Sequence, residues 1–197
     1  AAGLRFSMDD RLRRSLLYVP ASSEVMLRKA PSRGADAIIV DLEDGVLPDA
    51  KEGARARVES LWLELDLGSA EVLLRVNATG TPWHEGDLAA AARIRPAGVV
   101  LPKCEDEAAV AGVAARLEGT PLFLMVETAR GILGAPGLAR APQAAALVFG
   151  GADFRASVRA SREPDEAEIL VARCALVLAA RAAGIAAFDT PFFEYRD

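Results

Sequence analysis

Residues 34–44 read GADAIIVDLED, and this stretch decides the fold class. A glycine opens it, an uninterrupted apolar run fills positions 37–40, and acidic residues follow at 41, 43 and 44. Such a run is typical of a strand buried on both faces, as in a parallel sheet covered by helices. The glycine is the residue type expected just after a helix, where the backbone turns left-handed.

The same pattern recurs along the chain. Apolar runs predict strands at 15–20, 37–42, 71–77, 98–103, 121–128, 146–150 and 185–190. Helical spacing of apolar residues predicts helices at 23–32, 50–65, 105–117 and 166–183, with Gly34, Gly119 and Gly184 following three of them. Alternation of this kind is stable either as a doubly wound sheet or as a barrel.

Polar residues at the carboxyl ends of the strands favour the barrel. They are Asp41, Glu43, Asp44, Arg75, Asn77, Lys103, Glu127, Asp153 and Asp189. Side chains from so many strand ends converge when the strands form a ring, and the carboxyl-terminal face of a barrel carries the chemistry. Neither a GxGxxG nor a Walker A sequence is present, which disfavours nucleotide-binding folds.

We therefore predict an α/β protein with a TIM-type (β/α)8 barrel. Only seven strands are counted, so either the eighth strand is absent from this chain or two strands have been merged into one. Residues 1–12 are predicted to be an N-terminal extension, and 13–197 a barrel catalytic domain that is incomplete at its C-terminus. We expect that the native polypeptide extends beyond Asp197, or that another chain fills the gap, because an unpaired strand edge invites association.

Composition narrows the function classes. The formal net charge of −5 gives no electrostatic reason to bind nucleic acid. No apolar stretch reaches the roughly 18 residues that a membrane span requires. The two cysteines, Cys104 and Cys174, have neither a metal-binding nor a CxxC spacing, so a reducing, cytoplasmic location is the simplest expectation.

Glu127 and Asp153 are the candidate metal ligands. Each follows an apolar run, so both carboxylates are expected at one solvent-facing mouth on neighbouring strands. Two carboxylates with room for water and substrate oxygens suit Mg²⁺, and the absence of thiol or imidazole partners disfavours zinc. The alternative is that each carboxylate caps the helix that follows it.

Arg75 is the candidate substrate ligand, because a guanidinium can bind a carboxylate through two parallel hydrogen bonds. Its alternative role is an internal salt bridge to Asp41, Glu43 or Asp44, and the two roles are compatible. Glu43 or Asp44 is predicted to hold metal-bound water or to orient Arg75, and a solvated loop is the alternative.

Two further residues have competing interpretations. Lys103 at a barrel mouth suggests a Schiff-base lysine, although its neighbour Glu105 would oppose the required loss of charge. His84, in a polar loop, is predicted to be a surface histidine, with a catalytic base as the alternative.

Seven ordered motifs resemble the citrate lyase β-subunit-like branch of the HpcH/HpaI aldolase family. They are RRSLLYVPASS (13–23), GADAIIVDLEDGV (34–46), LLRVN (73–77), GVVLPK (98–103), MVETARGILGAP (125–136), VFGGADF (148–154) and ARAAGIAAFDT (180–190). The resemblance implies a Mg²⁺-binding barrel that cleaves a 3-hydroxy-acyl thioester to a keto acid and an acetyl thioester. It assigns catalysis to Arg75, Glu127 and Asp153, substrate contact to Arg75 and Glu127, and metal ligation to Glu127 and Asp153.

The resemblance also implies a final strand and a C-terminal segment that this chain lacks, and it implies partners and alternatives. The substrate is a citryl-, citramalyl- or malyl-type thioester on CoA or on an acyl-carrier protein. A homo-oligomer, a trimer or a multiple of it, is expected, with citrate lyase α and γ subunits as further candidate partners; nucleic acid and membrane are not expected. A thioesterase, or a non-catalytic subunit of a lyase assembly, is the alternative function.

Overall fold

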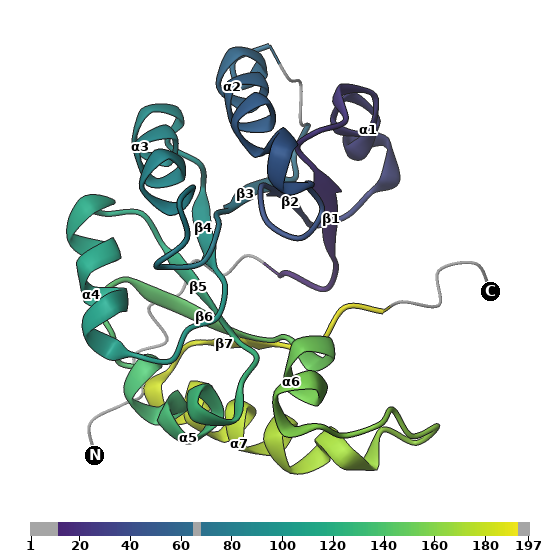
Figure 1. Cartoon of the computed structure of the whole chain (residues 1–197), viewed down its shortest axis with the longest axis vertical. Coiled ribbons are helices and arrows are strands. Elements are labelled where there is room, and N and C mark those ends of the chain that lie inside the picture. Colours follow the sequence, from purple (N-terminus) through teal and green to yellow (C-terminus); the bar gives the residue numbers. More distant parts are fainter. Residues whose placement is uncertain (1–11, 65–67, 193–197) are drawn as a thin grey trace. The chain divides into compact units, whose positions relative to one another are not determined.

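A computed structural model describes residues 12–64 and 68–192 of the chain. Residues 1–11 of the predicted extension, residue 65 at the end of one predicted helix and residues 193–197 lie outside this part. Strands and helices alternate along the described chain (Figure 1). Every strand predicted from an apolar run is present. Their bounds are β1 Leu16–Pro20, β2 Ala37–Asp41, β3 Glu71–Arg75, β4 Gly98–Leu101, β5 Leu122–Val126, β6 Ala144–Phe149 and β7 Ala186–Phe188.

The helices include the four that were predicted and three that were not. The predicted helices are α1 Glu24–Lys29, α2 Lys51–Leu61, α4 Glu107–Arg116 and α7 Ala167–Ala183, with short 3-10 turns η1 Ala30–Arg33 and η2 Pro48–Ala50. The additional helices are α3 His84–Ile94, α5 Ala129–Leu138 and α6 Gly151–Val158. Gly34 and Gly184 end their helical segments in the left-handed conformation, with φ of 71° and 75°. The expected role of these glycines is confirmed.

The strand order in the sheet is the order in the chain, from β1 to β7. The pairs β1–β2, β2–β3, β3–β4 and β6–β7 are parallel. Parallel strands in chain order, each connected to the next through a helix, are the topology of the (β/α) barrel rather than of a doubly wound sheet. No eighth strand is present within residues 12–64 and 68–192. The fold class is the predicted one, as far as its seventh strand.

The chain divides into two compact units. Of the described residues, the N-terminal unit holds those up to Leu101 together with Val113–Leu122, and the C-terminal unit holds Pro102–Gly112 and those from Phe123 onward. Each unit has a core of strand residues. Ile38, Ile39, Val40, Leu73 and Leu74 are fully buried in the first, and Phe123, Leu124, Ala146 and Leu147 are buried in the second.

Strands β2 and β5 are covered on both faces, as continuous apolar runs require, whereas β1 and β7 are mostly half-buried. All five residues of β2 and all five of β5 are buried. Because the strand interiors are buried, polar side chains emerge at the strand ends. Among the described helices, none is both long enough and apolar enough to cross a bilayer.

Candidate functional site

Arg75 and Asp41 occupy neighbouring strand ends in the N-terminal unit. They are aligned partners at the last positions of β3 and β2, and aligned residues of parallel strands point to the same face. Nε and Nη2 of Arg75 donate hydrogen bonds to Oδ1 and Oδ2 of Asp41, each at 2.7 Å. This is the two-bond geometry by which a guanidinium binds a carboxylate. The internal ion pair raised as an alternative is present, and substrate contact by Arg75 stays a prediction.

Glu43 and Asp44 lie beside the same guanidinium. Nη1 of Arg75 is 3.0 Å from Oε2 of the buried Glu43 and 3.9 Å from Oδ2 of Asp44, which is 62% exposed. Burial by itself lowers the pKa of Arg75, but the hydrogen bond to Asp41 and the charges of Asp41 and Glu43 outweigh it, so the pKa is raised. Arg75 is therefore a permanent cation, and Glu43 is placed to orient it. A role for either acid in holding metal-bound water stays a prediction.

Asp41 also organises the loop that carries these acids. Its Oδ1 accepts the backbone N–H of Glu43 at 2.8 Å, and its Oδ2 accepts that of Gly45 at 2.8 Å. With the two bonds from Arg75, the carboxylate accepts four hydrogen bonds. The buried negative charge of Asp41 is thus compensated by a cation and by two backbone dipoles.

In the C-terminal unit, Glu127 lies at the end of β5 and Asp153 lies in the first turn of α6, the helix that follows β6, and Lys103 contacts both. Glu127 directly follows β5, and its Oε1 accepts the backbone N–H of Lys103 at 2.7 Å. The ammonium of Lys103 is 3.9 Å from Oδ2 of Asp153. The two predicted metal ligands and the strand-end lysine therefore form one cluster within this unit.

The helix-cap alternative for these carboxylates is wrong. Thr128 is the N-cap of α5, and its side chain accepts the N–H of Gly131 at 3.0 Å. Helix α6 begins after Gly150 without a side-chain cap, and Asp153 lies inside its first turn. Neither Glu127 nor Asp153 is therefore placed to satisfy a helix end.

The expectation that both carboxylates face solvent is right for Asp153 and wrong for Glu127. The side chain of Asp153 is 44% exposed, whereas Glu127 is 3% exposed. Gly150 explains the difference, because its N–H donates to the carbonyl of Val126 and brings the backbone against Glu127. A Cβ at position 150 would lie 2.4 Å from Oε2 of Glu127, so only glycine permits this approach.

The donor set of this cluster fits Mg²⁺. Among the described residues, no group of three or more His, Cys, Asp or Glu side chains is arranged to hold a metal ion. Magnesium is usually held by one or two carboxylates and keeps several waters, whereas zinc is usually held by three or four protein ligands, most of them nitrogen or sulfur. One buried and one half-exposed carboxylate are enough protein ligands for Mg²⁺ but too few for zinc.

The structure corrects the interpretation of His84. This residue is buried, at 4% exposure, as the first residue of α3, and its Nδ1 is 2.7 Å from the carbonyl oxygen of Asn77. Its polar sequence surroundings had indicated a surface position. Lys103 does not fit a Schiff-base role, because its side chain is 44% exposed beside Asp153 rather than enclosed in an apolar pocket.

The sequence analysis did not predict the buried polar network formed by Asn77, Asp87 and Arg55. Asp87, 1% exposed, accepts both the backbone and the side-chain N–H of Asn77, at 2.9 and 2.6 Å, and its other oxygen accepts from Arg55 at 3.0 Å. Asn77 was one of the polar strand ends. Asp87 and Arg55 lie in helices, where nothing in their spacing distinguishes them from solvent-facing charges.

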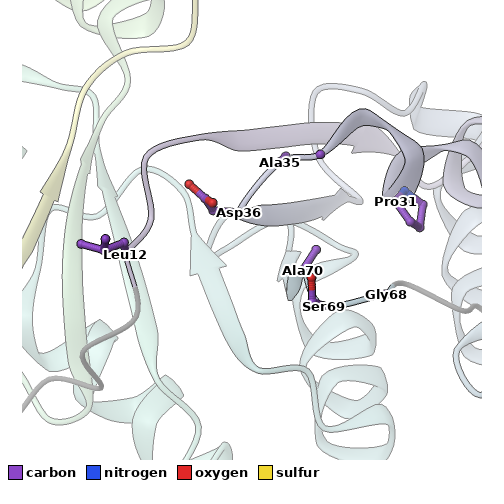
Figure 2. Close-up of a pocket in the computed structure, with 8 residues that line it drawn as sticks. Leu12, Pro31, Ala35, Asp36, Gly68, Ser69 and Ala70 are labelled. Carbon is purple, nitrogen blue, oxygen red and sulfur yellow. The ribbon is translucent and has the colours of Figure 1, made fainter.

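A small pocket of about 210 Å³ lies at the other end of the N-terminal unit's strands (Figure 2). Asp36, just before β2, and Ser69 and Ala70, just before β3, line it. Catalytic groups of barrel proteins lie at the carboxyl ends of strands, whereas the amino ends serve stability. The carboxylate of Asp36 is held by the side chain and the backbone of Arg14, so this pocket is not the candidate site.

Parallel strands in chain order, with charged residues gathered at their carboxyl ends, define a protein of the (β/α)-barrel class. Residues 14–197 match the model of the HpcH/HpaI aldolase/citrate lyase family. The chain belongs to this family.

Individual relatives agree with this assignment. The chain is 36% identical to a (3S)-malyl-CoA thioesterase of Cereibacter sphaeroides, over 93% of this chain and 65% of the relative. It is 35% identical to the mitochondrial citramalyl-CoA lyase of Rattus norvegicus, over 94% of this chain and 61% of the relative. The chain thus spans less than two thirds of the length of these curated relatives.

A solved structure also matches. It is the citrate lyase β subunit from M. tuberculosis complexed with oxaloacetate and magnesium, with a TM-score of 0.80 and 31% sequence identity. The match covers 94% of this chain and 82% of that chain. The similarity confirms the barrel-type fold and the resemblance to citrate lyase β subunits.

Proposed function

We propose that this chain is the barrel part of a Mg²⁺-dependent carbon–carbon lyase that cleaves a 3-hydroxy-acyl thioester. The observation that carries the proposal is the cluster of Glu127, Asp153 and Lys103, which come just after β5, β6 and β4, in a chain of this family. Relatives named as acting on malyl-CoA and citramalyl-CoA support a CoA thioester with a 3-hydroxyl and a carboxylate. The products would be a keto acid and an acetyl thioester.

Glu127 and Asp153 would hold the Mg²⁺, which supplies Lewis-acid activation of the substrate's hydroxyl and carboxylate oxygens. Glu127 is pre-positioned for this role by the Lys103 backbone N–H on its Oε1. Asp153 is the more accessible of the two and stands beside the Lys103 ammonium. That ammonium would offset the negative charge that accumulates when a carboxylate substrate enters.

Arg75 would fix the substrate carboxylate. Its Nε and Nη2 are already bound to Asp41 and its Nη1 faces Glu43, so the guanidinium is held rigidly by its neighbours. Preorganised charge of this kind costs no reorganisation when substrate arrives. Loss of the 3-hydroxyl proton would turn the hydroxyl-bearing carbon into the carbonyl of the keto acid. The electron pair of the broken carbon–carbon bond would pass to the thioester's α-carbon as an enolate, which takes up a proton to give the acetyl thioester.

The decisive experiment is a cleavage assay with a panel of citryl-, citramalyl- and malyl-CoA in the presence of Mg²⁺ or EDTA. We expect Mg²⁺-dependent release of acetyl-CoA together with the keto acid that corresponds to the substrate. Release of a free hydroxy acid and CoA, without a keto acid, would instead support the thioesterase alternative, which the relative from Cereibacter sphaeroides favours. No turnover of any thioester would count against both.

Partners and location form part of the same proposal. A CoA-linked or carrier-protein-linked substrate, a cytoplasmic location and a homo-oligomer remain our predictions. Size-exclusion chromatography with light scattering tests the oligomer, and parallel assays with CoA and carrier-protein thioesters test the carrier.

A further inference from the structure

Lys51 is a buried lysine in an electrostatically unfavourable position. It is 6% exposed and is the first residue of helix α2. The N-terminus of a helix carries a partial positive charge, so a cation there is disfavoured. Burial lowers the pKa of its ammonium, while the nearby acids Asp41, Glu43 and Asp44 act in the opposite direction. A lysine retained under these conditions needs specific partners.

Those partners are backbone carbonyls of the loop after β2. Nζ of Lys51 donates to the carbonyl oxygens of Leu42 and Glu43, at 3.0 and 2.9 Å. The ammonium also lies over the ring of Trp83, 5.1 Å from its centroid, where the ring face attracts a cation. The charge of Lys51 is therefore directed at the backbone of residues 42–43.

The side chain of Glu43 continues this chain of contacts to Arg75. Its carboxylate is 3.0 Å from Nη1 of Arg75, and its backbone N–H is bound by Asp41. Glu43 is thus held by Lys51 through its carbonyl and by Asp41 through its N–H. We propose that Lys51 is a positioning residue, which fixes the backbone at Leu42 and Glu43 and so holds the Glu43 carboxylate against Arg75.

The neighbouring hydrogen-bond network separates the effect of Lys51 at Glu43 from its effect at Leu42. The carbonyl oxygen of Leu42 has a second donor, the side chain of Asn77 at 3.0 Å, which Asp87 anchors in turn. Loss of the Lys51 ammonium would therefore leave Leu42 tethered to the Asn77 side chain, whereas the carbonyl of Glu43 would keep only the backbone N–H of Val46, at 3.0 Å in the same loop. We expect a local loosening at Glu43 rather than unfolding of the unit.

The first test needs no activity. Lys51→Met and the milder Lys51→Gln remove the ammonium, and Arg93→Met, which removes an exposed cation paired with Glu59, is the control. Amide hydrogen exchange is followed by NMR for Glu43 and Gly45, whose N–H groups bind Asp41, and for residues inside β2. We expect exchange at Glu43 and Gly45 to accelerate by about tenfold or more in the Lys51 variants, with β2 unchanged.

The outcomes separate positioning from general stabilisation. Uniform acceleration in β2 and in the loop would show that Lys51 merely stabilises the fold, and unchanged exchange at Glu43 would show that it holds nothing there. Either result overturns the inference. If Lys51→Met does not fold, Lys51→Gln carries the same expectation.

The second test connects the residue to the proposed function, on which this part of the inference rests. Oxaloacetate and Mg²⁺ are used as probes in calorimetry. We expect the Lys51 variants to bind oxaloacetate about 10- to 100-fold more weakly, the scale of loss when a binding group is displaced by about 1 Å, while Mg²⁺ affinity is retained. Unchanged oxaloacetate affinity would refute the connection. A wild-type protein that binds no oxaloacetate would instead refute the proposed function, and the exchange experiment would still decide the role of Lys51.

Discussion

Arg75→Lys tests both roles of Arg75 in one variant. Lysine keeps the positive charge but lacks the planar fork, so one ammonium replaces a group that donates to both oxygens of Asp41 and faces Glu43. Asp41 and Glu43 are 3% and 5% exposed, so water replaces the lost contacts poorly.

The magnitude follows from these contacts. Losing one hydrogen bond to a buried charge costs about 1.5–3 kcal/mol, and breaking a buried ion pair outright costs about 3–5 kcal/mol. Lysine retains part of the pair, so we expect a loss of about 2–4 kcal/mol in the free energy of unfolding. For a chain of this size, each kcal/mol lowers the Tm by about 2–4 °C, which gives a total of roughly 4–16 °C.

Activity gives the second readout. If Arg75 binds the substrate carboxylate, Arg75→Lys should also reduce kcat/KM by about 2 kcal/mol or more, which is about 30-fold. Thermal unfolding by circular dichroism and steady-state cleavage kinetics measure the two effects on the same samples. Arg93→Lys, in an exposed ion pair with Glu59, is the matched control, and its stability should change by less than about 0.5 kcal/mol.

The Tm and the kcat/KM of Arg75→Lys test the structural role and the substrate role of Arg75 independently. A lower Tm with wild-type kcat/KM would confine Arg75 to a structural role and remove it from the substrate site. A wild-type Tm would refute the energetic reasoning from the observed ion pairs.

Three further predictions follow from other parts of the structure. Glu127→Gln and Asp153→Asn should each weaken Mg²⁺ binding in calorimetry, and Glu127→Gln should also lower the Tm because Glu127 is buried; unchanged affinity in both variants would contradict the ligand assignment. The hydrogen bond and charge of Arg14 hold the pKa of Asp36 well below its ordinary value, so the ion pair contributes stability above the unfolded pKa of about 3.9 and loses it as the pH falls further. The Tm difference between wild type and Asp36→Asn should therefore shrink below about pH 4, and a difference independent of pH would argue against this. Burial raises the pKa of the Cys104 thiol while Cys174 is exposed, so iodoacetamide should label Cys174 in the folded protein and Cys104 only after unfolding, as peptide mass spectrometry would reveal.

The strands could be predicted from the amino-acid sequence, because a strand buried on both faces needs an apolar residue at nearly every position. Helices α3, α5 and α6 were not predicted, and for α5 the reason is local. Helix α5 contains Gly131, Gly134, Pro136 and Gly137, residues that normally disfavour helix. The structure gives a reason for one of them, because a Cβ at Gly131 would lie 2.6 Å from the carbonyl oxygen of Cys104. That close approach joins residues far apart in the chain, and periodicity carries no information about it.

The polar strand ends were also visible in the sequence, but their partners were not. Arg75 was expected near Asp41, Glu43 or Asp44, and only the register of β2 against β3 selected Asp41 for the two-bond pair. Likewise, Glu127 was expected to be open to solvent, and the backbone of Gly150 covers it. The burial of Lys51 could not be predicted, because in the sequence a lysine at the start of a helix does not differ from a solvent-exposed charge. Only the fold places carbonyl groups around its ammonium. Burial and pairing are properties of contacts between distant segments, so tertiary structure alone decides them.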